Sequence, residues 1–104
     1  MPQRTALEAD IINALRTVYD PEIAVNIYDL GLIYDIRVDE ENKAFITMTL
    51  TAPNCPIAEE VVANVRDAVA DVPKVTDAEV ELVYEPEWIT DMMSEEAKLE
   101  LGLL

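Results

Sequence analysis

The chain contains a single cysteine, Cys55, and the residues around it are of types that can make its thiol reactive. Pro56 suits the first position of a helix, where a missing N–H costs nothing, so Cys55 is expected at the N-cap. The free N–H groups of the first helical turn and the positive helix end favour a thiolate, which attacks electrophiles and binds soft metals. Glu59 and Glu60 oppose this ionisation by adding negative charge nearby. A small, buried, apolar cysteine is the structural alternative.

The residues that precede the thiol add a stiff loop and a row of hydroxyl groups. Pro53 and Pro56 bracket the cysteine and restrict the backbone, although both also suit an ordinary turn from a strand to a helix. Thr47, Thr49 and Thr51 alternate along the preceding segment. This row either hydrogen-bonds a ligand or forms the solvent-facing side of a strand, where threonine is common.

Carboxylates are the other candidate ligands, as metal-binding oxygens or as an acid–base pair. Those considered are Asp20, Glu22, Asp29 and Asp35. Their signal is weak, because close pairs arise by chance in a chain with 22 Asp and Glu. Asp20 before a proline is typical of a turn. The segment from Asp29 to Gly31 also has the pattern of a turn, with the glycine at positive φ.

Missing residue types exclude several classes of mechanism. The chain has no histidine, so it cannot contain a Ser-His-Asp triad, a Cys-His pair or an imidazole-bound zinc. One cysteine excludes an intrachain disulfide and a four-thiolate metal site within one chain. The two glycines, Gly31 and Gly102, lie too far apart for a Walker or Rossmann phosphate loop.

The balance of charge points away from nucleic acids and membranes. Seven Lys and Arg against 22 Asp and Glu give a formal net charge of −15, which repels phosphate backbones and anionic lipids. No apolar run approaches the ~18 residues of a membrane helix, and no signal peptide is apparent. We therefore expect a cytoplasmic domain whose thiol stays reduced. The acidic surface either suits a salty cytoplasm or steers a basic partner.

Periodicity predicts the elements that must position these residues. A first helix is expected from a Thr5–Glu8 capping box to about Tyr19, with a buried stripe of Leu7, Ile11, Leu15 and Val18. A loop over 21–30 and two strands over 32–38 and 44–51 should follow it. The remaining expected elements are a helix from Pro56 to Val72, a strand over 78–84 and a short helix between Ser94 and Gly102.

This order predicts one domain over residues 1–104 with an α+β fold. The expected architecture is a two-layer sandwich in which helices cover one face of a small sheet that contains an antiparallel hairpin. Trp88, Met92 and Met93 are expected in the core or in a lid, with a partner-binding surface as the minority interpretation.

Four blocks of the sequence together resemble a known family. They are Val18 to Glu22, Val25 to Tyr34, Thr47 to Pro56, and Trp88 to Ser94. In this order and spacing they resemble the metal–sulfur cluster biosynthetic protein family of the SufT/PaaD type, which includes the eukaryotic cytosolic iron–sulfur targeting factor. The resemblance extends from about Leu7 to Leu103 and implies an α+β two-layer fold. It also implies an auxiliary role in iron–sulfur cluster assembly or delivery, rather than an enzyme.

Carried over by position, the resemblance makes Cys55 the family's reactive cysteine. The other motif positions, whose role the resemblance leaves open, are Asp20, Glu22, Asp29, Gly31, Thr49, Thr51, Pro53 and Pro56. One departure lies in the tail, where the family often has Pro-Pro-Trp-Thr and this chain has Pro86-Glu87-Trp88-Ile89.

One thiolate cannot complete the coordination of a cluster that usually takes about four cysteine ligands. The leading hypothesis is therefore that Cys55 is a transient ligand or contact of an iron–sulfur cluster shared with a second subunit, a small thiol or a partner protein. Assembly scaffolds and recipient apoproteins are the implied partners, with a homodimer as one arrangement. The alternative is a metal-free adaptor that binds assembly proteins. A thiol-dependent enzyme is the weakest hypothesis, because no nearby residue offers an obvious base.

Overall fold

The computed structural model describes residues 2–20, 25–50 and 58–102 of the chain. In these ranges the elements are α1 (Pro2–Leu15), β1 (Ile33–Val38), β2 (Lys43–Met48), α2 (Ala58–Ala70), β3 (Asp77–Leu82), the short 3-10 helix η1 (Thr90–Met92) and α3 (Glu95–Glu100). Their order is the one predicted from the sequence, with η1 added in the tail.

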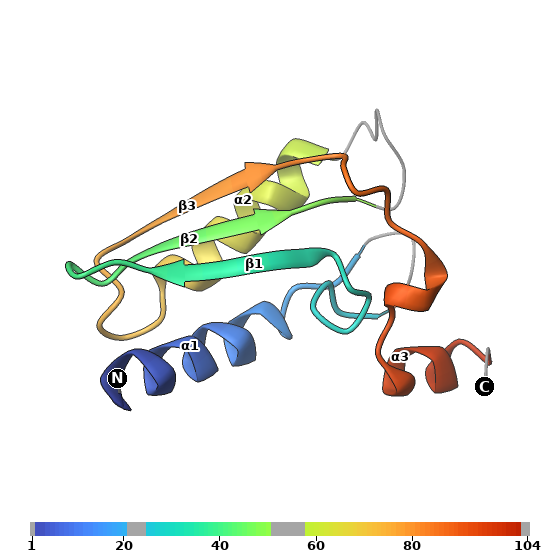
Figure 1. Ribbon diagram of the computed structural model, residues 1–104, viewed down its shortest axis with the longest axis horizontal. Helices are drawn as coiled ribbons and strands as arrows, with labels where there is room; N and C mark the ends of the chain where they lie inside the picture. Colours follow the sequence, from blue (N-terminus) through green and yellow to red (C-terminus); the bar gives the residue numbers. More distant parts are fainter. Residues whose placement is uncertain (1, 21–24, 51–57, 103–104) are drawn as a thin grey trace.

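The described strands form one mixed sheet in the order β1-β2-β3 (Figure 1). β1 and β2 make the predicted antiparallel hairpin, with Ile36 opposite Ile46. β3 runs parallel to β2, with Val80 opposite Ile46, because α2 carries the chain back between the two strands. The predicted α+β fold is confirmed.

The core lies between one face of the sheet and the apolar stripes of the two long helices. Alternate side chains of β2 point into it. The buried residues include Ala44, Ile46 and Met48 from β2, Val61, Val65 and Val69 from α2, and Leu7, Ile11, Leu15 and Val18 from α1 and the turn after it. Each large apolar side chain buried there contributes about 1.5–3 kcal/mol.

Helix α1 keeps the predicted buried stripe but differs from the prediction at both ends. It begins at Pro2, before Thr5, so the predicted capping box does not start it; proline suits a first helical turn. The helix ends at Leu15, earlier than predicted. The cause is Thr17, whose backbone N–H and Oγ1 both donate to the carbonyl of Ala14, at 3.0 and 2.6 Å.

Strand β1 contains an irregularity that simple alternation did not anticipate. Its register with β2 shifts between Ile33 and Asp35, so Tyr34 is the extra residue of a bulge. The alternating pattern grouped Tyr34 with the apolar side of the strand. In the structure Ile33 packs against the core instead, and the Tyr34 hydroxyl donates to the carbonyl of Pro86 at 2.6 Å.

The threonine row does not form a continuous solvent-facing surface. β2 ends at Met48, and Thr49 is only 1% exposed. The N–H of Thr49 donates to the carbonyl of Leu32 on one side, while the carbonyl of Met48 accepts from the N–H of Val83 on the other, both at 2.8 Å. Because neighbouring segments flank the chain here, the solvent-facing interpretation is wrong for Thr49. Thr47 stays half-buried.

The C-terminal helix has the predicted start and stop signals. Ser94 is its N-cap, and its Oγ accepts a hydrogen bond from the N–H of Ala97 at 3.1 Å. Gly102 follows the helix with φ 75°, the left-handed conformation that ends many helices. Met93 is buried and Trp88 packs against the core, which confirms the core interpretation for both.

None of the helices in the described ranges has the length and apolar character needed to cross a membrane.

Candidate functional site

The turn from Asn26 to Gly31 is the centre of the described motif positions. The N–H of Leu30 donates to the carbonyl of Asn26, and the N–H of Gly31 to that of Tyr28. Asn26 and Asp29 are also paired by two bonds: the Asp29 N–H donates to Asn26 Oδ1 at 2.9 Å, and Asn26 Nδ2 donates to Asp29 Oδ2 at 2.8 Å. Gly31 has φ 83°, so the predicted turn with its glycine at positive φ is confirmed.

Asp29 connects three parts of the chain. Its Oδ1 lies 3.8 Å from Nε of Arg16, which follows helix α1. The Arg16 guanidinium also lies over the Tyr28 ring, 5.2 Å from the ring centre. The backbone carbonyl of Asp29 accepts from the N–H of Ser94 at 2.8 Å. Because Asn26 and Arg16 already engage the carboxylate, its geometry supports a structural role more than that of an open metal ligand.

The C-terminal tail packs directly on this turn. A Cβ at Gly31 would lie 2.2 Å from the carbonyl oxygen of Met92, so only glycine allows this approach. The indole N–H of Trp88 donates to the carbonyl of Leu30 at 2.7 Å. The Tyr34 hydroxyl, besides its bond to the tail at Pro86, lies 3.7 Å from Sδ of Met92.

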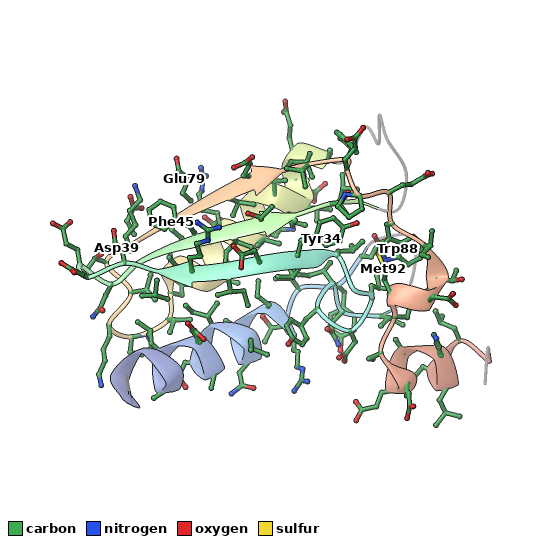
Figure 2. All side chains as sticks on the ribbon, viewed as in Figure 1. Tyr34, Asp39, Phe45, Glu79, Trp88 and Met92 are labelled. Atoms are coloured by element: carbon green, nitrogen blue, oxygen red, sulfur yellow. The ribbon has the colours of Figure 1, made fainter. Side chains whose placement is uncertain are left out.

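Figure 2 shows the side chains of Tyr34, Trp88 and Met92 gathered beside the start of β1. We call these tail contacts the tail clasp, made by Pro86, Trp88, Met92 and Ser94 on Asp29, Leu30, Gly31 and Tyr34.

Asp20 lies buried beside the same turn, with 7% of its surface exposed. Its N–H donates to the carbonyl of Val25 at 3.2 Å, and Tyr19 forms an isolated antiparallel bridge with Asn26. These bonds hold together the described residues on either side of positions 21–24. Asp20 is thus placed next to the segment that leads to Asp29.

The described motif positions therefore converge at one end of the sheet. Asp20, Asp29 and Gly31 belong to the paired segments just described, and Thr49 is joined to Leu32, the residue after Gly31. The end of β2 and the start of α2 lie at this same end (Figure 1). The remaining candidates, Glu22, Thr51, Pro53, Cys55 and Pro56, lie outside the described residues, so their placement stays a prediction.

Asp35 does not join this group. Its Oδ2 lies 2.7 Å from Nε of Arg37, and both side chains line a hollow on the open face of the sheet with Phe45 and Thr47. Over residues 2–20, 25–50 and 58–102, no three Asp, Glu or Cys side chains are grouped to hold a metal ion.

The sequence alone predicted no role at this site for Arg16, Asn26 or Tyr34. Asn26 carried a local signal, because an Asn three residues before an Asp can pair with it across a turn. Tyr34 carried no such signal, since its hydrogen-bond partner Pro86 lies 52 positions away.

The fold and the converging motifs define a small α+β domain whose tail is held on the turn that begins its sheet. The family described as "Iron-sulfur cluster assembly protein" matches residues 8–82, and the chain belongs to this family. The predicted resemblance is confirmed.

Two similar proteins cover nearly the whole chain. A "Fe-S protein maturation auxiliary factor" from Porphyromonas gingivalis is 57% identical over 97 residues, which are 93% of this chain and 92% of that protein. A crystal structure from Bacillus anthracis, described as a domain of unknown function, has a TM-score of 0.91 at 41% identity, covering 98% of this chain and 97% of that one.

A longer relative contains a region similar to this chain. The "Iron-sulfur cluster carrier protein" of Mycobacterium tuberculosis is 35% identical over 95 residues, which are 91% of this chain but only 23% of that protein. In that relative, the similar region is joined to a much longer polypeptide.

Proposed function

We propose that the chain is a non-catalytic factor in iron–sulfur cluster maturation, and that Cys55 is the point at which it contacts the cluster being transferred. The cluster is cargo in this proposal and not a resident cofactor. The observation that carries the proposal is family membership over residues 8–82, combined with a single cysteine in the setting Pro53-Asn54-Cys55-Pro56. The description of the P. gingivalis relative as a maturation auxiliary factor supports the same role.

The few ligands that this chain can supply favour transient binding of a cluster over permanent binding. A cluster usually takes about four cysteine ligands, and this chain supplies one thiolate. Carboxylates are harder ligands and poorer matches to iron–sulfur units, and Asp29 is already engaged by Asn26 and Arg16. The remaining ligands must therefore come from another molecule. A cluster held by few ligands from this chain can leave it easily.

Described residues on both sides of the Cys55 segment are anchored in the core. Leu50 is 5% exposed, and Val61 in the first turns of α2 is buried in the core. The neighbouring turn is fixed by the tail clasp. A partner that contacts these anchored residues would meet surfaces that lose little conformational entropy on binding.

A carrier of clusters and a recipient apoprotein are the partners that fit this role. The M. tuberculosis carrier supports the first, because a region similar to this chain occurs within the same polypeptide there. We further propose that the protein acts in the cytoplasm, where a reducing environment keeps a lone thiol available.

Replacing Cys55 tests the proposal directly. Cys55→Ser should abolish support of iron–sulfur enzymes in a deletion strain, because a serine hydroxyl is a poor ligand for iron–sulfur units. Wild type reconstituted anaerobically with iron, sulfide and a thiol should gain cluster absorbance and bound iron, and Cys55→Ser should gain neither. The folded state of the variant is checked by its urea unfolding curve.

Two results would count against the role of Cys55. Full activity of Cys55→Ser in the deletion strain would remove the ligand role altogether. A wild-type protein that stays colourless and iron-free even with a carrier present, yet still binds that carrier, would favour the metal-free adaptor.

A further inference from the structure

Strand β3 forms one edge of the described sheet, with a neighbour only on its β2 side (Figure 1). The N–H of Val83 donates to the carbonyl of Met48 in β2. Because backbone groups alternate in direction along a strand, those of Ala78, Val80 and Leu82 point toward the open edge. The N–H of Ala78 already donates to Oδ1 of Asp77 at 2.9 Å. The backbone groups of Val80 and Leu82 are therefore the ones that can hydrogen-bond to an added strand. Such an edge is a template for another strand.

A groove runs along this edge between β3 and α2, and its part beside the start of α2 is mainly apolar. A hollow of about 340 Å³ is lined by Ala58, Glu59, Val62, Ala63, Arg66 and Leu82. A second hollow along the same edge shares Val62 and Arg66 and adds Ala78 and Val80 together with the charged side chains of Lys43, Asp77 and Glu79. We call the two together the edge groove. It would receive the apolar side chains of an added strand.

The other face of β3 is acidic. Asp77, Glu79 and Glu81 are exposed and alternate with Ala78, Val80 and Leu82 of the groove side. Glu79 lies opposite Phe45 of β2 on the open face of the sheet, and Figure 2 labels both. An added strand would place every second side chain next to these carboxylates, where a cation is favoured and an anion is disfavoured.

This charge pattern also argues against a second copy of the chain on the edge. Two β3 strands paired antiparallel would place the carboxylates of both copies on the same face. In every such register, acidic residues would face acidic residues across the pair, which destabilises the pairing. The edge therefore selects a partner of a different charge pattern.

We propose that the free edge of β3 and the edge groove bind an extended segment of another protein in which basic residues alternate with apolar ones. The apolar side chains enter the groove, the basic side chains pair with Glu79 and Glu81, and the backbone bonds to Val80 and Leu82. Ala58 lines the groove and follows Cys55 by three positions in the sequence, so the docked protein lies near the start of the helix after the cysteine. The site does not require Cys55 to bind a cluster.

The test uses a short capped peptide in which lysine alternates with valine. It should bind the full-length protein and slow hydrogen exchange at the amides of Val80 and Leu82. Glu79→Lys/Glu81→Lys should weaken this binding roughly tenfold or more and should gain binding of the matching glutamate–valine peptide. Val62→Gln should weaken the lysine peptide without changing the net charge of the protein.

Two controls separate the site from general attraction to an acidic protein. Glu40→Lys/Glu100→Lys makes the same change in net charge at exposed positions outside β3 and should keep the affinity of wild type. A block peptide of the same composition, with its lysines grouped at one end, should bind weakly to wild type.

Three results of the peptide experiments would overturn the proposal. They are equal binding of the block peptide, equal loss of affinity in the Glu40→Lys/Glu100→Lys control, and unchanged exchange at Val80 and Leu82 in the peptide complex. A wild-type dimer whose contact protects Val80 and Leu82 would also overturn it, because a second copy would then occupy the edge.

Discussion

At the scale of single residues, Gly31 is the position where one missing side chain decides how two segments meet. Its φ of 83° is unfavourable for residues with a Cβ, and a Cβ would lie 2.2 Å from the carbonyl oxygen of Met92. The other glycine, Gly102, has a similar φ of 75°, but apart from its chain neighbours no atom of the described residues lies within 4 Å of the position that a Cβ would take. Comparing substitutions at the two glycines therefore separates the cost of backbone strain from the cost of the clash with the tail.

Gly31→Ala should destabilise the protein more than Gly102→Ala. Backbone strain of about 1–3 kcal/mol applies to both substitutions, but only the alanine at position 31 must also displace the tail clasp. Urea unfolding of both variants measures the difference in the free energy of unfolding. Equal losses would mean that the tail moves away from Gly31 at no cost.

At the scale of elements, hydrophobic periodicity was enough to predict most of the fold. The stripe of α1, the β1–β2 hairpin, α2 and the capped α3 all follow from local patterns. The bulge at Tyr34 and the burial of Thr49 did not, because both depend on segments far away in the sequence. The bond from Trp88 to Leu30 spans 58 positions, and no local pattern encodes such a contact.

The candidate site was predictable only in part for the same reason. The turn at Asp29 and Gly31 has a local sequence signature, which the structure confirms. Its pairing with Arg16 and with the tail follows from tertiary packing and was not predicted. The prediction of a reactive Cys55 rests on its position and on family membership.

The tail clasp should open locally when its hydrogen bonds are removed. Trp88→Phe keeps an aromatic ring but leaves the carbonyl of Leu30 without its donor, which costs about 1–3 kcal/mol for a buried acceptor. Hydrogen exchange at the N–H of Ser94, which donates to Asp29, should then become faster, while exchange in the core strand β2 changes less.

Tyr84→Phe is the matched control, because Tyr84 is an exposed aromatic residue in the same tail. It should leave the exchange of Ser94 as in wild type. Equal acceleration of Ser94 and of β2 in Trp88→Phe would show that the tail does not open separately from the core.

At the scale of the whole molecule, helix α2 borders both the end of the sheet where the motif positions converge and the edge groove. Its start lies at the end of the sheet where the motif positions converge, and its exposed side borders the edge groove with β3. A protein bound along β3 would thus lie beside the helix that follows Cys55 in the sequence. The excess of acidic residues would bring a basic segment to this edge and also repel other copies of the chain.

The same excess of charge should make stability depend on salt. Seven Lys and Arg cannot pair with 22 Asp and Glu, and the ion pairs of the described residues join Arg16 to Asp29, Arg37 to Asp35, and Lys43 to Asp77. The carboxylates in excess repel one another in the folded state. Since salt shortens the range of this repulsion from ~30 Å at 0.01 M to ~3 Å at 1 M, NaCl should raise the urea midpoint.

The charge-matched variant Glu40→Lys/Glu100→Lys tests whether repulsion among carboxylates lowers the stability of the fold. It removes part of the net negative charge without touching the core or the three ion pairs named above, so it should be more stable than wild type at low salt and should gain less from added NaCl. Urea unfolding of both proteins across a NaCl series measures how strongly the urea midpoint of each protein depends on salt. If wild type and variant respond equally to salt, or if NaCl lowers the wild-type midpoint, mutual repulsion is not what limits the stability of the fold.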